Sequence, residues 1–101
     1  MASRMDLQRE LKSILGTSQV YYQSPENLKM SYPAIVFFID DINNNYANDH
    51  KYLQHNRYMI TLIDRNPESE YVDSILALPY CSFDRHYIID NLNHFIFEIY
   101  W

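Results

Sequence analysis

The sequence predicts a single α+β domain over residues 1–101, with a mainly antiparallel β-sheet of four to five strands and two helices packed on one face. The length of 101 residues suits one hydrophobic core and leaves no room for a second domain. The predicted elements follow one another in the order helix, strand, strand, helix, strand, strand. The last two strands are joined by a short turn, which favours antiparallel pairing.

The first element is a helix that ends at Leu15. Ser3 with Asp6 three positions on resembles a capping box, which marks a helix start. Gly16, the only glycine in the chain, follows directly and is suited to the left-handed residue that ends a helix. An apolar stripe along this helix comprises Leu7, Leu11, Ile14 and Leu15.

Strands are predicted next. The stretch "SQVYYQ" has the composition of a short strand, and "PAIVFFIDD", residues 33–41, is apolar on both faces until Asp40. We expect it to be a central strand covered on two sides. "INNNYANDH", residues 42–50, is rich in turn-forming Asn and Asp and indicates a loop or a hairpin tip. "LQHNRYMITLID", residues 53–64, predicts a further strand.

A second helix is predicted within "DRNPESEYVDSILAL". Asn66 is expected to be the N-cap, Pro67 suits the first helical position, and Glu68 complements the helix dipole. Pro79 ends the segment. The stripe that we expect to be buried comprises Tyr71, Val72, Ile75 and Leu76.

The remaining residues predict a closing hairpin with its turn near Asp90 and Asn91. In the last strand one face is entirely apolar and the other is mixed, because the side chains of a strand alternate between its two faces. The apolar face comprises Phe95, Phe97, Ile99 and Trp101.

Composition excludes several classes of function. The net charge is −5 and the chain has no basic run, so it lacks the electrostatic footprint of a nucleic-acid binder. Its single cysteine, Cys81, allows no intramolecular disulfide and no zinc site with several thiolates, and its single glycine allows no phosphate-binding loop. The N-terminus has no apolar signal region and the longest apolar run is "AIVFFI", so we expect a soluble, intracellular protein that contacts no membrane.

Side chains that could bind metal are present, but none sits at a recognisable ligand spacing. Catalysis by Cys81 would need His86 or His94 as base and Asp84 to orient it, and this spacing is not diagnostic either. We therefore predict no metal, no cofactor and no catalytic residue, with Cys81 as a small buried side chain. The possible ligands are His50, His55, His86, His94, Asp40, Asp41, Asp84 and Asp90.

The stretch "DRHYIIDNLNHFIF", residues 84–97, places several polar side chains in the closing hairpin. Asp84, Arg85 and His86 are expected to alternate along its first strand, with His94 and Glu98 on one face of its second. One interpretation is a solvated sheet face with cross-strand charge pairs. The other is a protein interface, which we favour because ten tyrosines and 16% aromatic residues exceed what one small core requires.

Several motifs resemble those of the tail terminators, small tail-completion proteins of long-tailed bacteriophages. They are "IDRNP" at residues 63–67, "ALP" at 77–79, "FDR" at 83–85 and "DNLNH" at 90–94, followed by a terminal aromatic strand. The strand "YPAIVFFIDD", residues 32–41, is also similar to the family's first core strand. The likeness is most specific from Arg57 onward.

This resemblance implies a structural virion protein rather than an enzyme, assembled in the host cytoplasm and located at the head-proximal end of the tail. It implies a homo-oligomeric ring of six copies that caps the tail tube, stops its polymerisation and joins the stopper protein of the head-tail connector. Genomic DNA would pass the acidic lumen without specific binding. The expected interface residues are Tyr46, Asp49, Asp84, Arg85, His86, Tyr87, His94, Glu98, Tyr100 and Trp101.

Other functions stay open from the sequence. The chain could be a different head-tail connector component, such as a stopper or adaptor. It could be an intracellular adaptor that binds one protein through the hairpin face. A small metal-dependent hydrolase would use Asp40 or Asp84 together with His86 or His94.

Overall fold

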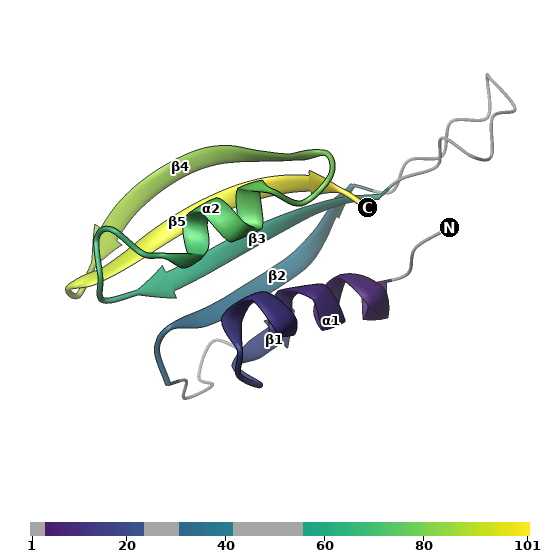
Figure 1. Cartoon of the computed structure of the whole chain (residues 1–101). Coiled ribbons are helices and arrows are strands. Elements are labelled where there is room, and N and C mark those ends of the chain that lie inside the picture. Colours follow the sequence, from purple (N-terminus) through teal and green to yellow (C-terminus); the bar gives the residue numbers. More distant parts are fainter. Residues whose placement is uncertain (1–3, 24–30, 42–55) are drawn as a thin grey trace, which may run out of the picture.

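The computed structural model describes residues 4–23, 31–41 and 56–101, and the predicted loop at 42–50 therefore lies outside the described residues. The predicted α+β class is confirmed: five strands form one mixed sheet in the order β1-β2-β3-β5-β4, with two helices against it (Figure 1). Only the β1–β2 pair is parallel. The elements are α1 (Arg4–Leu15), β1 (Val20–Tyr22), β2 (Ala34–Asp41), β3 (Arg57–Asp64), α2 (Tyr71–Leu76), β4 (Cys81–Ile89) and β5 (Leu92–Tyr100).

Helix α1 ends as its sequence predicts. Gly16 has φ +77°, a left-handed conformation that glycine adopts without steric cost, and its N–H donates to the carbonyl of Lys12 at 2.8 Å. The expected N-terminal residue Ser3 lies outside the described part of the chain. The buried side chains of α1 are Leu7, Leu11 and Leu15.

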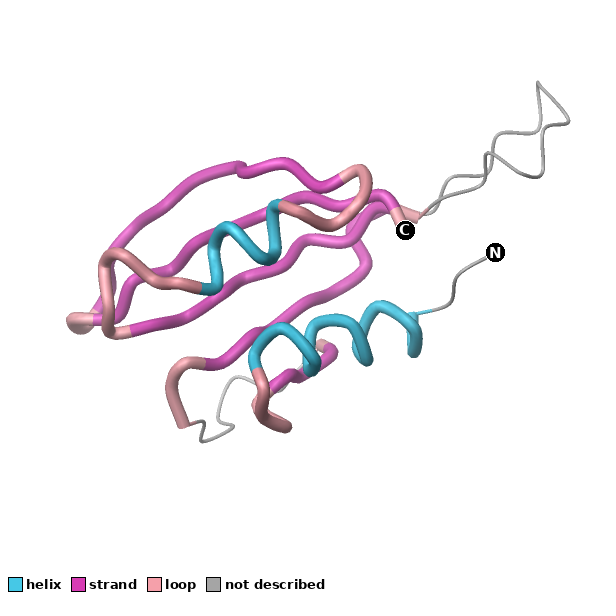
Figure 2. The backbone as a smooth tube through the Cα atoms, in the orientation of Figure 1, coloured by secondary structure: helices cyan, strands magenta, loops and turns pink. Residues whose placement is uncertain are grey.

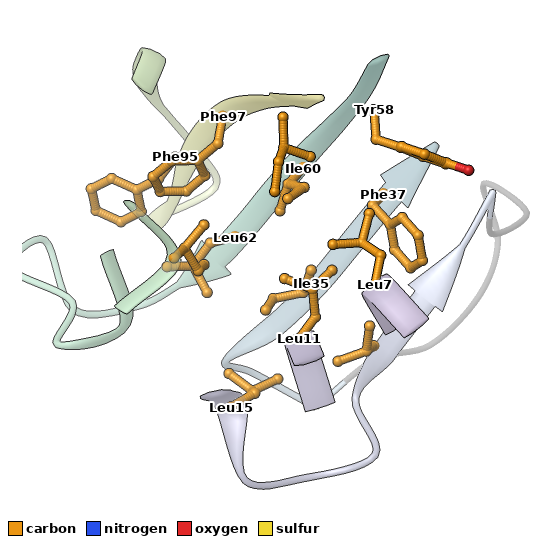
Figure 3. Close-up of a cluster of buried hydrophobic side chains, with 13 residues drawn as sticks. Leu7, Leu11, Leu15, Ile35, Phe37, Tyr58, Ile60, Leu62, Phe95 and Phe97 are labelled. Atoms are coloured by element: carbon orange, nitrogen blue, oxygen red, sulfur yellow. The ribbon is translucent and has the colours of Figure 1, made fainter. Parts of the chain in front are cut away.

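The hydrophobic core lies between the two helices and one face of the sheet (Figure 3). Leucines of α1 meet the apolar side chains of β2, and the central strands β3 and β5 complete the layer. Burial of these side chains is the main favourable contribution to folding. The core residues of the sheet include Ile35, Phe37, Tyr58, Ile60, Leu62, Phe95, Phe97 and Ile99.

Strand β2 is central in the sheet, as predicted, but the expectation that it is covered on both faces is wrong. Both helices pack on the same side of the sheet (Figure 2), so only alternate residues of β2 reach the core. Phe37 is fully buried, whereas its neighbour Phe38 points to the other side and is 41% exposed. Because the run is apolar at successive positions, the sequence pattern does not show that one face is buried and the other exposed.

Helix α2 begins later than its sequence predicts. Asn66 does not cap the helix: its N–H donates to Asp64 Oδ1 at 3.1 Å, and its own Oδ1 accepts the N–H of Glu68 at 2.9 Å. These side-chain hydrogen bonds hold residues 64–68 in successive turns, and the cap position is Glu70 instead. The predicted stripe of α2 is confirmed, with Ile75 buried and Tyr71, Val72 and Leu76 packed against the core.

The closing hairpin forms at the predicted turn. Asp90 has φ 53° and Asn91 has φ 65°, the pair of left-handed residues that a two-residue hairpin loop requires. Asn and Asp tolerate this conformation better than other side chains do. The turn fixes the register of β4 against β5, with Ile89 opposite Leu92 and Tyr87 opposite His94.

Candidate protein interface

The strand register assigns each paired residue of the sheet to one of two faces. Phe97 pairs with Ile60 of β3, and both are buried beneath the helices, so the intervening residues of each strand lie on the opposite side. We call this opposite side the helix-free face. Its members include Val36, Phe38, Arg57, Met59, Thr61, His94, Ile96, Glu98, Tyr100, Arg85, Tyr87 and Ile89.

Most of the sequence-predicted interface residues of the hairpin lie on the helix-free face. Two others lie on the helix side: His86 pairs with Phe95, and Trp101 packs against the core. Tyr46 and Asp49 lie outside the described residues. The predicted residues that the structure brings together are Arg85, Tyr87, His94, Glu98 and Tyr100.

A β-bulge at Asp84 sets this distribution. The register passes from Phe83–Phe97 directly to Arg85–Ile96, which leaves Asp84 as an extra residue in β4. The expected alternation through Asp84, Arg85 and His86 is therefore wrong at this point. Arg85 Nε contacts Asp84 Oδ2 at 3.3 Å.

Stacked rings lie across the hairpin at two cross-strand positions. Tyr87 and His94 are cross-strand partners. Their ring centroids are 4.8 Å apart, and the angle between their ring planes is 9°. On the other side His86 stacks on Phe95 at 4.5 Å and 9°. The less favoured interpretation, a solvated face with cross-strand charge pairs, is not supported at Arg85, because the residue opposite it is the apolar Ile96.

A buried asparagine links the hairpin to the segment that precedes α2. Asn93 is only 4% exposed, and its Nδ2 donates to the carbonyls of Asp64 and Arg65, each at 3.3 Å. Its Oδ1 lies 2.9 Å from His86 Nε2. Sequence reasoning missed this role, and the only available signal was a polar residue in line with Phe95 on the apolar face of β5.

An arginine that the sequence analysis did not single out organises one end of the helix-free face. Arg57 forms an ion pair with Asp40 and lies opposite Tyr100 in the register. Hydrogen bonds to Tyr100 and then to Asp40 raise the pKa of the Arg57 guanidinium above its ordinary value, and the nearby Glu98 carboxylate adds to the effect. The available sequence signal was a basic residue in one predicted strand and two aspartates at the end of the strand that precedes it in the chain.

Large apolar side chains are exposed on this face and along β4. Ala34 and Ile63 at one end of the helix-free face are buried, so the exposed part begins beyond them. Every residue of β4 after Cys81 is exposed. The exposed large apolar side chains on these two surfaces are Phe38, Phe83, Tyr87, Ile88, Ile89 and Tyr100.

Within the described residues, no group of three or more His, Cys, Asp or Glu side chains is placed to hold a metal ion. Burial raises the pKa of the Cys81 thiol to about 11, opposite to the lowered pKa that a thiolate nucleophile needs. A hollow on α1 is lined by Met5, Gln8, Arg9 and Lys12, which supply no carboxylate, imidazole or thiol.

Comparison with protein-family models, curated proteins and solved structures finds no match for this chain. Among the helices of the described segments, none combines the length and apolar character needed to cross a membrane. The interpretation of this chain therefore depends on the geometry of the helix-free face. That face combines stacked rings, an arginine held by an ion pair, and exposed apolar side chains. Such a combination is suited to contact with another protein surface.

Proposed function

We propose that the chain is a non-enzymatic assembly protein, a tail terminator that forms a ring on the tail tube of a long-tailed bacteriophage. The ring of six copies would stop growth of the tube and receive the stopper protein of the head-tail connector. The motifs between Arg57 and Trp101 support this proposal from the sequence side. The virion location and these partners belong to the same proposal.

The observation that carries the proposal is the helix-free face, which no helix or strand of the described residues covers. Phe38 is exposed at its β2 side, and Tyr100 is exposed beside Arg57 at one end. An antiparallel sheet that packs one face on the core and leaves the other face in solvent normally has polar residues on the solvated face. Here the solvated side keeps large apolar groups, which a small domain retains at a cost unless another surface covers them.

The arrangement of this face fits a specific contact. Aromatic rings that are already stacked, such as Tyr87 on His94, lose little side-chain entropy when a partner covers them. The Arg57 guanidinium is likewise held in place by Asp40. In a ring, this face would contact a different surface of the next copy, since head-to-tail contacts join two unlike surfaces.

The experiment measures the assembly of the whole purified chain and of two variants. Light scattering after size exclusion should give a mass of several copies, and negative-stain images should show an annulus. Phe38→Ser and Tyr100→Ser should each weaken assembly and reduce binding to purified tail tubes. Met5→Ser is the matched control, because Met5 is 55% exposed but lies on α1.

Two results would overturn the proposal. One is a chain that stays monomeric over all concentrations tried and does not join tail tubes. The other is assembly that is unchanged in both sheet-face variants.

No feature of the described residues favours the hydrolase alternative, because Asp40 is ion-paired with Arg57 and Asp84 contacts Arg85.

A further inference from the structure

The outer edge of β4 is the longer of the two edges of the sheet in the described part of the chain. β4 has nine residues, and no described element lies beyond it on this side of the sheet (Figure 1). Residues 82–89 are exposed on both faces, with Ile88 at 62% and Ile89 at 52%. An edge of this length and apolar character is a template for a further strand, whose addition would cover these side chains.

We propose that β4 pairs antiparallel with β4 of a second copy around a two-fold axis, in the register that places Asp84 opposite Arg85 of the second copy. The two sheets then continue into one sheet of ten strands, because each copy supplies the five strands of its own sheet. The contact is isologous, which means that the same strand is used by both copies.

The lengths of the two sheet edges favour a second β4 as the occupant. The other edge is β1, which has three residues. A contact between β4 and β1 of another copy would leave most of the β4 edge without a partner. Pairing of β4 with itself in this register uses residues 81–88 of both strands, which is all of β4 except Ile89.

The bulge makes this register possible. Opposed residues of neighbouring strands must lie on the same face of the sheet. In the proposed register Phe83 meets His86 of the second copy, and both belong to the helix side, since they pair with Phe97 and Phe95 within their own sheet. In a regular strand, residues 83 and 86 would lie on opposite faces.

The same agreement holds further along the strand. Ser82 meets Tyr87 of the second copy, and both lie on the helix-free face. Cys81 meets Ile88 of the second copy on the helix side, so an apolar pair closes the contact at each end. Because each copy has one extra residue at Asp84, the residues before the bulge in one copy lie on the same face as the residues after the bulge that they meet in the other copy.

Charge selects this register over its neighbours. Around the two-fold axis, Asp84 of each copy faces Arg85 of the other, and the four side chains form an alternating quartet. Within one copy Arg85 already contacts Asp84 at 3.3 Å, and their side chains are 68% and 35% exposed. A shift by one residue would place either Arg85 or Asp84 opposite itself, which is unfavourable.

This contact does not depend on the proposed ring. The subunits of a closed ring meet head to tail, whereas the β4 contact is two-fold, so each can exist without the other. A ring that assembles normally while β4 remains unpaired would uphold the proposed function and overturn this inference. A β4 dimer without a ring would do the reverse.

The test uses charge reversal in the full chain and sedimentation equilibrium at several protein concentrations. Asp84→Arg places Arg opposite Arg, and Arg85→Asp places Asp opposite Asp, so each variant alone should raise the dimer Kd by about ten-fold. An equimolar mixture of the two variants should recover the wild-type affinity, because the mixed dimer restores both opposite-charge pairs. The double variant should also recover it.

Matched controls carry the same charge changes on α1, where Glu10→Arg and Arg9→Asp should leave the dimer Kd unchanged. Circular dichroism checks that every variant is folded. The inference is overturned if the wild-type chain forms no dimer. It is also overturned if the single variants associate as tightly as the wild type, or if mixing them fails to restore the affinity.

Discussion

His86 donates a hydrogen bond from Nε2 to Oδ1 of Asn93, at 2.9 Å. The direction follows from the other end of the amide, because Asn93 Nδ2 donates to the carbonyls of Asp64 and Arg65 and Oδ1 is left as the acceptor. Nε2 of His86 therefore carries the proton. This bond and the two amide bonds to the carbonyls together link the hairpin to the segment before α2.

The first prediction concerns this tautomer. Neutral His86 should be protonated at Nε2, because Asn93 Oδ1 can only accept. Long-range proton–nitrogen NMR spectra distinguish the two tautomers, and His94 provides a second imidazole for comparison. Its Nδ1 lies 3.1 Å from the carbonyl of Leu92 and so should carry the proton, which is the opposite assignment. An Nδ1-protonated His86 would contradict the assigned direction of the hydrogen bond.

The second prediction concerns the buried amide. Asn93→Leu removes all three hydrogen bonds of the side chain at a site that is 4% exposed, and should lower the free energy of unfolding by ~2–3 kcal/mol. His86→Phe keeps a ring against Phe95 and removes only one of these bonds, so it should cost ~1 kcal/mol. Urea unfolding measures both. Equal losses in the two variants would contradict a role for the carbonyls of Asp64 and Arg65.

The third prediction compares two neighbouring phenylalanines of β2. Phe37→Ala creates a cavity in the core and should lower the free energy of unfolding by ~3–5 kcal/mol, since Phe37 is fully buried. Phe38→Ala should cost ~1 kcal/mol or less, because Phe38 lies on the helix-free face. The two variants delete the same atoms, so their difference in urea unfolding reports the difference between the faces. Similar losses would contradict the assignment of faces.

The fourth prediction concerns pH. Burial raises the pKa of the Cys81 thiol from 9.0 to about 11, so the folded state favours the neutral thiol. This contribution to stability is complete below the unfolded pKa and is lost as pH rises through the folded pKa. Between about pH 8 and about pH 10 the wild-type chain should lose ~1 kcal/mol more than Cys81→Ala, which has no titrating group there. Parallel losses in urea unfolding would contradict this account.

The fifth prediction concerns the hairpin turn. Asn91 has φ 65°, which glycine adopts more readily than any other residue, so Asn91→Gly should raise the free energy of unfolding by ~0.5 kcal/mol. Asn91→Val should lower it by ~1–2 kcal/mol, because a β-branched side chain is strained at positive φ. Thermal unfolding of both variants provides the measurement. Stabilisation by valine would exclude the left-handed turn.

The sequence by itself determined the features whose cause is local. The apolar stripe of α1 and its end at Gly16 follow from periodicity and from the conformational freedom of glycine. The turn at Asp90 and Asn91 follows from their tolerance of positive φ. Each of these features depends on residues close together in the chain, so the local sequence is sufficient to predict it.

The tertiary structure alone decided the composition of the candidate interface. The bulge at Asp84 set which side chains share a face, and no local signal distinguishes a bulged strand from a regular one. The ion pair of Arg57 with Asp40 and the link from Asn93 to Asp64 join separate elements. Such contacts depend on strand register, where a shift of one residue exchanges the two faces, and register is fixed only when the whole sheet has packed.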